Sequence, residues 1–150
     1  MTENTRLLLT EEQEQEIMAA IATAEKKTSG EIRLHVERHC LIEPYKRAVQ
    51  VFEFLKMHKT KLRNGVLFYL AFEDRKFAVI GDKGINEKVP EGFWDSTKDK
   101  VLENFRNERF AEGLACGIAE AGNQLRTHFP YERGDINELT NRISYLENRK

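Results

Sequence analysis

Hydrophobic and polar positions in the first part of the chain switch between the spacing of a helix and that of a strand. Residues 10–27 place apolar side chains on one helical stripe, and Thr10 can form a capping box with Gln13 at its start. Residues 31–39 alternate apolar and polar side chains, which predicts a strand near the edge of a sheet with one polar face. Residues 43–58 return to helical spacing.

The next segment differs because it is apolar on both faces. Residues 66–72 predict a strand in the sheet interior, covered by helices on both sides. The short segment 73–75 predicts a hairpin turn into a returning strand at residues 76–80. Residues 90–105 and 110–129 then carry helical stripes. In the last of these, Gly113 and Gly117 lie one turn apart and predict a close packing contact with a neighbouring element.

The order of these segments predicts one α/β domain in residues 1–130, followed by a polar tail in residues 131–150. A chain of 150 residues has the usual size of a single domain. The tail has few apolar residues, and the sequence leaves two alternatives open: it is mobile, or it packs across the sheet.

Charge and cysteine content exclude several functional classes. The formal net charge is −1, from 24 Lys and Arg against 25 Asp and Glu, so the composition offers no electrostatic basis for nucleic-acid binding. No apolar run approaches the roughly 20 residues of a membrane-spanning helix. Cys40 and Cys116 lack the paired spacing of a zinc or redox motif, which favours a cytoplasmic location.

Three turns are predicted to meet at one edge of the sheet. The strand–helix–strand unit of residues 31–72 predicts a right-handed parallel crossover, and the hairpin makes the third strand antiparallel to the second. With these directions, the starts of the first two strands and the end of the third share an edge. Glu31, Asn64 and Asp82 occupy those positions, each beside a glycine.

The side chains at this edge suit a hard divalent cation. Carboxylate, amide and carbonyl oxygens are the ligands that calcium and magnesium prefer, and Glu87 follows shortly downstream. A structural interpretation stands beside this one, because carboxylates often cap helices and glycines often close turns. Asp82 in particular precedes a helical segment that it can cap.

The residues around these turns resemble the TPM-domain family, in the form of a small bacterial member without a transmembrane segment. The resemblance extends over roughly residues 7–139. It rests on an ordered series of motifs: Thr28-Ser29-Gly30-Glu31-Ile32-Arg33, Arg63-Asn64-Gly65-Val66-Leu67, Gly81-Asp82-Lys83-Gly84-Ile85-Asn86-Glu87-Lys88-Val89, Phe93-Trp94, Arg109-Phe110-Ala111-Glu112-Gly113-Leu114 and Asp135-Ile136-Asn137-Glu138-Leu139.

This resemblance implies a three-layer α/β/α sandwich around a short mixed β-sheet. It also implies a divalent cation, often calcium, held by acidic loop residues at one edge of the sheet. The corresponding residues of this chain are Glu31, Asn64, Asp82 and, downstream, Glu87. Some members have been assigned acid phosphatase activity, and others look like accessory domains of membrane proteins.

Two functions follow as hypotheses. The first is a metal-binding domain with a regulatory or interaction role toward an unidentified protein partner. The second is a metal-dependent acid phosphatase that uses the same cleft, with Arg33 or Lys83 contacting the phosphate. No phosphate-loop or serine-hydrolase motif supplies catalytic residues, so these stay unknown. Phe93, Trp94 and Tyr131 are available for a docking surface, although the apolar character of the first two favours core packing.

Overall fold

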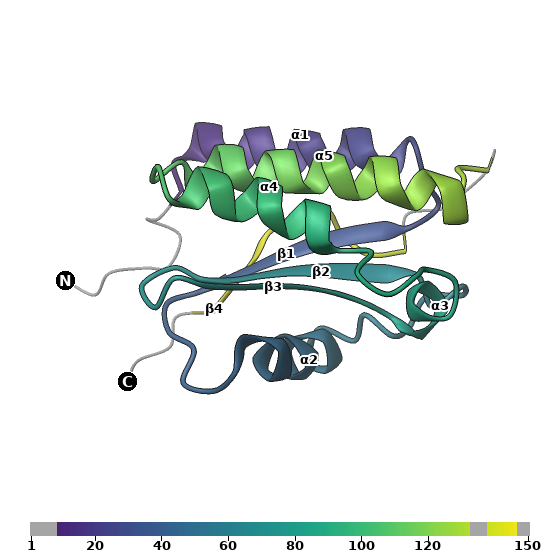
Figure 1. The fold of residues 1–150 in the computed structure, drawn as a ribbon, viewed down its shortest axis with the longest axis horizontal. Helices are drawn as coiled ribbons and strands as arrows, with labels where there is room; N and C mark the ends of the chain where they lie inside the picture. The colour runs from purple at the N-terminus through teal and green to yellow at the C-terminus, as the bar shows by residue number, and fades with distance from the viewer. Residues whose placement is uncertain (1–8, 133–137, 147–150) are drawn as a thin grey trace.

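A computed structural model describes residues 9–132 and 138–146 of the chain (Figure 1). The part of the tail motif at residues 135–137 and the first residues of the chain therefore lie outside the described residues. The elements, in chain order, are α1 (Glu11–Glu25), β1 (Glu31–Glu37), α2 (Pro44–Phe54), β2 (Gly65–Ala71), β3 (Lys76–Gly81), α3 (Lys83–Asn86), α4 (Asp95–Phe105), α5 (Phe110–His128) and β4 (Ser144–Leu146).

The strands form one mixed sheet in the order β3-β2-β1-β4. β1 and β2 are parallel with Glu31 opposite Gly65, and β2 and β3 are antiparallel with Val66 opposite Gly81. The crossover and the hairpin predicted from the sequence are therefore confirmed. β2 is buried along its whole length, because its uniformly apolar side chains face helices on both sides.

Helices cover both faces of this sheet, which confirms the three-layer α/β/α sandwich (Figure 1). α1, α4 and α5 pack on one face, where Ile32, Leu34 and Val36 of β1 join their apolar stripes in one core. α2 packs on the opposite face over β2 and β3, against Leu67 and Tyr69. The alternation of β1 thus assigns its apolar side chains to the three-helix layer.

Local signals in the sequence act as predicted at two helices. The side chain of Thr10 accepts a hydrogen bond from the Gln13 backbone, and Gln13 returns one to Thr10, which forms the capping box of α1. In α5, a side chain at Gly117 would overlap with Val101 of α4, and one at Gly113 would approach Asn104 within 2.9 Å. The two glycines therefore allow α4 and α5 to pack closely, as predicted.

Part of the tail adds a strand to the sheet. Its residues 144–146 form β4, which pairs in parallel with residues 35–37 of β1. β1 consequently lies beside the edge strand, and its first half has no pairing partner on that side among the described residues. Of the two alternatives for the tail, packing onto the sheet applies to its described part. A three-residue strand with few apolar side chains gives little sequence signal of its own.

Phe93 and Trp94 belong to the core side of the molecule. Phe93 is buried and Trp94 is partly buried against the same core, with their rings in an edge-to-face contact. Core packing therefore accounts for both. In the part of the chain that the structure describes, no helix is both long enough and apolar enough to cross a membrane.

Candidate functional site

The three turns predicted to meet do lie together at one edge of the sheet. The Glu31 backbone N–H donates to the Asn64 carbonyl at 3.1 Å, and the Asp82 N–H donates to the Gly65 carbonyl at 2.9 Å. Glu31, Asn64 and Asp82 are all buried, with 4%, 2% and 6% of their surfaces exposed. The backbone thus brings the three predicted residues to one edge, and their side-chain partners decide what each contributes.

Asp82 is engaged by protein groups. Its two carboxylate oxygens accept hydrogen bonds from Arg63 at 2.8 and 2.9 Å, the bidentate arrangement typical of strong arginine–carboxylate pairs. Its Oδ1 also accepts from the Lys83 N–H at 2.7 Å, so Asp82 caps α3. The structural interpretation of Asp82 as a cap is therefore correct. Gly84 allows this turn, because a side chain there would overlap with the Arg63 carbonyl.

Glu31 contacts the tail. Its Oε1 accepts a hydrogen bond from the Leu139 N–H at 2.6 Å, and its carboxyl group also lies in hydrogen-bonding contact with the carboxyl group of Glu138. Burial raises the pKa of Glu31, and the charge of Glu138 raises it further, against the lowering effect of the backbone donors. Two carboxyl groups in contact share either a proton or a cation, because two bare negative charges repel at this distance.

A third acidic residue borders this pair. Glu25, at the end of α1, accepts a hydrogen bond from the Ile32 N–H at 3.0 Å and one from the Asn141 side chain. Burial, together with the nearby charge of Glu31, raises the pKa of Glu25 to about 7. Glu31 thus lies between two other carboxyl groups, Glu25 on α1 and Glu138 in the tail, and interacts electrostatically with each of them.

Asn64 presents an oxygen without a partner at the same edge. Its amide nitrogen donates to the Ser29 carbonyl at 2.8 Å, which fixes the orientation of the side chain. Its Oδ1 is buried and has no hydrogen-bond partner within the described residues. A buried amide oxygen without a partner costs free energy, so this atom is available to a ligand.

The fit to a metal is partial. Among residues 9–132 and 138–146, no three Asp, Glu, His or Cys side chains come close enough together to hold an ion by themselves. An ion beside Glu31 therefore needs other donors, such as the Asn64 oxygen, backbone carbonyls and water. Calcium and magnesium accept such mixed oxygen sets, and magnesium usually keeps several waters.

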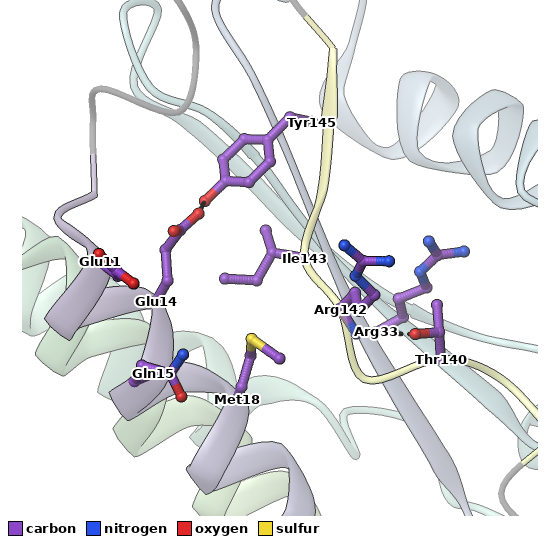
Figure 2. Close-up of a pocket in the computed structure, with 9 residues that line it drawn as sticks. All are labelled: Glu11, Glu14, Gln15, Met18, Arg33, Thr140, Arg142, Ile143 and Tyr145. Atoms are coloured by element: carbon purple, nitrogen blue, oxygen red, sulfur yellow. Dashed lines mark hydrogen bonds between the residues drawn. The ribbon is translucent and has the colours of Figure 1, made fainter.

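The remaining predicted residues lie in two different pockets. Lys83 and Glu87, both exposed, line a pocket of about 720 Å³ between α2 and β3 together with Asp82. Arg33 lines another pocket, of about 880 Å³, between α1 and the β4 segment (Figure 2). The two phosphate contacts of the phosphatase hypothesis are therefore not brought into one cleft.

The polar face of β1 holds a buried charge network. Glu37 is fully buried and accepts hydrogen bonds from Arg47 at 2.8 and 3.0 Å and from the Tyr69 hydroxyl, and it lies 3.0 Å from the His35 ring. Burial raises the pKa of Glu37, but these hydrogen bonds outweigh it and lower the pKa to about 2. The His35 ring reaches Ser144 at 2.9 Å, so the network joins β1, β2, α2 and β4.

Sequence reasoning missed three residues of these sites: Glu25, Glu138 and Arg142. Glu25 is the last residue of α1, and no motif in the sequence singles it out. Glu138 and Arg142 belong to the tail, whose placement on the sheet was left open. A signal existed only for Glu138, because it lies in one of the motifs that the chain shares with known sequences.

Comparison with known proteins agrees with this architecture. The sequence pattern that defines the TPM domain matches residues 4–124. No protein with a curated description matches the chain. The solution structure of the BA42 protein from the psychrophilic bacterium Bizionia argentinensis has 48% identity and a TM-score of 0.87, over 92% of this chain and 95% of that one.

Two more distant solution structures share the fold. The N-terminal domain of cg2496 from Corynebacterium glutamicum has 14% identity and a TM-score of 0.63, over 95% of this chain and 82% of that one. The N-terminal domain of a protein from P. gingivalis has 19% identity and a TM-score of 0.67, over 87% of this chain and 89% of that one. At these identities the likeness concerns the fold alone.

Proposed function

This chain belongs to the TPM-domain family, and we propose that it is a divalent-cation-binding domain with a regulatory or protein-interaction role. The ion is calcium or magnesium. Its ligands are the Glu31 carboxylate and the Asn64 Oδ1, joined by Glu138 from the tail. Two free cysteines, Cys40 and Cys116, are consistent with a cytoplasmic location as part of this proposal.

One observation carries the proposal: a buried amide oxygen without a partner lies at the same sheet edge as two carboxyl groups in contact. The Glu31 N–H bonds the Asn64 carbonyl, so the two residues are held together by the backbone. An ion between their side chains would satisfy the Asn64 oxygen and offset the repulsion between Glu31 and Glu138. A shared proton would relieve the repulsion but would leave the Asn64 oxygen without a partner.

Asp82 and Glu87 take different roles in this proposal. The bidentate pair with Arg63 already neutralises Asp82, so it supports the turn that holds Asn64 and does not supply a ligand. Glu87 is exposed in the pocket beside Asp82, where it is available to a weaker, second ion. The regulatory role proposed below belongs to the ion beside Glu31.

A regulatory role follows from where the ligands come from. Glu31 and Asn64 belong to the sheet edge, whereas Glu138 belongs to the tail that continues into β4. An ion held by both would favour tail docking, so cation concentration would change the surface that the tail presents. A protein partner that recognises the docked tail would then respond to the cation.

The alternative, a metal-dependent acid phosphatase, needs a phosphate-binding cation next to the metal. Arg33 supplies a positive charge that no carboxylate of the described residues neutralises, but Lys83 lies in the other pocket. A phosphatase assay with p-nitrophenyl phosphate in calcium and in magnesium tests this alternative. Turnover that disappears in Glu31→Gln and in Arg33→Gln supports it, and turnover that is absent or unchanged in both removes it.

Calorimetric titration of the chelator-treated protein tests the proposal itself. Wild type is titrated with calcium and then with magnesium, beside Glu31→Gln, Asp82→Asn and the matched control Glu103→Gln, which changes an exposed carboxylate of α4. We expect saturable binding that Glu31→Gln loses and Glu103→Gln keeps. Absence of binding by wild type, or binding that Glu31→Gln retains, contradicts the proposal. Loss in Asp82→Asn alone would place the ion beside Glu87.

A further inference from the structure

Two arginines that have no carboxylate partner among the described residues lie at one end of the pocket between α1 and the β4 segment. Arg38, Arg47 and Arg63 each face a carboxylate. Within the described residues neither Arg33 nor Arg142 does, and the Nε of Arg33 is buried without a hydrogen-bond acceptor. The Nε of Arg33 has thus lost its contact with water and gained no acceptor in exchange within the described residues.

The sheet register explains why the two arginines are close. His35 of β1 lies opposite Ser144 of β4, where the ladder begins, and Arg33 and Arg142 each precede that pair by two residues. Figure 2 shows both side chains at the same end of the pocket, next to Thr140. Two positive charges held at the same end of a pocket repel each other unless an anion lies between them.

The rest of the pocket has a different character. Met18 of α1 and Ile143 line its middle, whereas Glu11 and Glu14 lie at the end away from the arginines (Figure 2). Glu14 accepts a hydrogen bond from the Tyr145 hydroxyl, which connects α1 to β4 at that end. The pocket of about 880 Å³ has the size of a small-molecule site.

We propose that this pocket binds a small organic molecule with one oxyanion group, which Arg33 and Arg142 hold together. Guanidinium groups bind carboxylates and phosphates through paired hydrogen bonds, so either oxyanion fits the same two side chains. The aliphatic part of the ligand lies against Met18 and Ile143. Glu11 and Glu14 repel a second negative charge, so the far end of the ligand is neutral or cationic.

Partial burial of Arg33 adds to the geometric argument for this site. Burial lowers the pKa of the Arg33 guanidinium, and no carboxylate offsets that effect. Arg142 is exposed, so it can close on a ligand that Arg33 has already engaged. The site does not depend on a metal, so it is testable in the presence of a chelator.

The test is a titration followed by backbone amide NMR in EDTA, with three six-carbon probes that differ in charge pattern and a fourth, shorter probe that carries a phosphate. The probes are 6-aminohexanoate, hexanoate, adipate and O-phosphoethanolamine. We expect saturable shifts at Arg33 and Arg142 with 6-aminohexanoate, with O-phosphoethanolamine, or with both. Adipate is expected to bind about tenfold more weakly than hexanoate, because its second carboxylate meets Glu11 and Glu14. Binding of only one of the two zwitterions identifies the oxyanion as carboxylate or as phosphate.

Variants decide whether the arginine pair is responsible. Arg33→Met and Arg142→Met keep an unbranched apolar stem and remove the guanidinium charge, and each is expected to weaken binding about tenfold or more. The matched control is Arg126→Met, which removes an exposed charge at the end of α5 and leaves binding unchanged. Melting temperatures show that each variant is folded. Absence of saturable shifts in wild type, equal loss in Arg126→Met, or binding of adipate as strong as that of hexanoate overturns the proposal.

Discussion

Arg63 holds Asp82 through two parallel hydrogen bonds of 2.8 and 2.9 Å, and this pair joins the start of β2 to the end of β3. The side chain of Asp82 is almost completely buried, whereas Arg63 remains about half exposed. Arg63 also takes a positive φ of 51°, so the turn before β2 is held in a conformation that non-glycine residues seldom adopt. The pair thus stabilises the loop that presents Asn64.

The effects of substituting Arg63 and Asp82 on the melting temperature should be non-additive. Arg63→Gln leaves the Asp82 carboxylate buried without its cation and is expected to lower the melting temperature, whereas the double variant with Asp82→Asn recovers part of that loss. Thermal unfolding of wild type, both single variants and the double variant measures the coupling. A double variant whose loss equals the sum of the two single losses would show that the residues act independently.

Glu37 should control stability at acidic pH. Its pKa in the folded protein is about 2, below the usual value near 4.3, so the stability that ionised Glu37 contributes is complete above pH 5 and disappears as pH falls through 2. We expect Glu37→Gln to lower the free energy of unfolding by about 2–4 kcal/mol at pH 7. Urea unfolding at several pH values measures this difference.

The control for Glu37 is Tyr69→Phe, which removes the hydroxyl's hydrogen bond to the same carboxylate, together with its contact with Cys40, and keeps the ring in the core. Its expected cost is about 1 kcal/mol. The difference between wild type and Glu37→Gln must become smaller as pH falls from 5 toward 2. A difference that stays constant over this range would mean that packing, and not the charge, explains the effect.

Glu25 should have the opposite pH dependence. Its pKa in the folded protein is raised to about 7, so its protonated form stabilises the fold below the usual pKa and that contribution is lost as pH rises through 7. Glu25→Gln mimics the protonated form. In EDTA we expect the variant to match wild type at pH 4 and to be more stable by about 1–2 kcal/mol at pH 8, because the carboxyl group keeps partial contact with water.

Urea unfolding at the two pH values checks this prediction, with Glu103→Gln as the control for loss of an exposed carboxylate. Equal stability of Glu25→Gln and wild type at pH 8 would show that the Glu25 carboxyl group is solvated and has the usual pKa of a glutamate. Lower stability of the variant at pH 8 would show that the carboxylate is the form that the fold requires.

Gly117 should tolerate no side chain unless α4 changes with it. A Cβ at this position overlaps with Val101, so Gly117→Ala is expected to lower the free energy of unfolding by about 1–3 kcal/mol, despite the better helix propensity of alanine. Val101→Ala removes the overlapping methyl groups. Chemical denaturation should therefore show the double variant to be more stable than the sum of the single effects predicts, and a simple sum would contradict the close contact.

Much of the fold and part of the site followed from local patterns. The alternation of Ile32, Leu34 and Val36 indicated which face of β1 is buried, and the apolar segment 66–72 indicated a central strand. Strand directions then brought Glu31, Asn64 and Asp82 to one edge, because a parallel crossover and a hairpin leave few alternatives. Spacing and chain direction are properties that a sequence carries directly.

The partners of those residues were decided by tertiary structure alone. Nothing local indicates that Arg63 neutralises Asp82, that Leu139 donates to Glu31, or that the Asn64 oxygen stays without a partner. Arg33 and Arg142 are separated by more than a hundred positions, and only the pairing of β1 with β4 brings them together. By itself the sequence determined the layers, the strand directions and the family. The pairing of charged side chains depends on long-range packing. The local spacing of hydrophobic residues does not encode that packing.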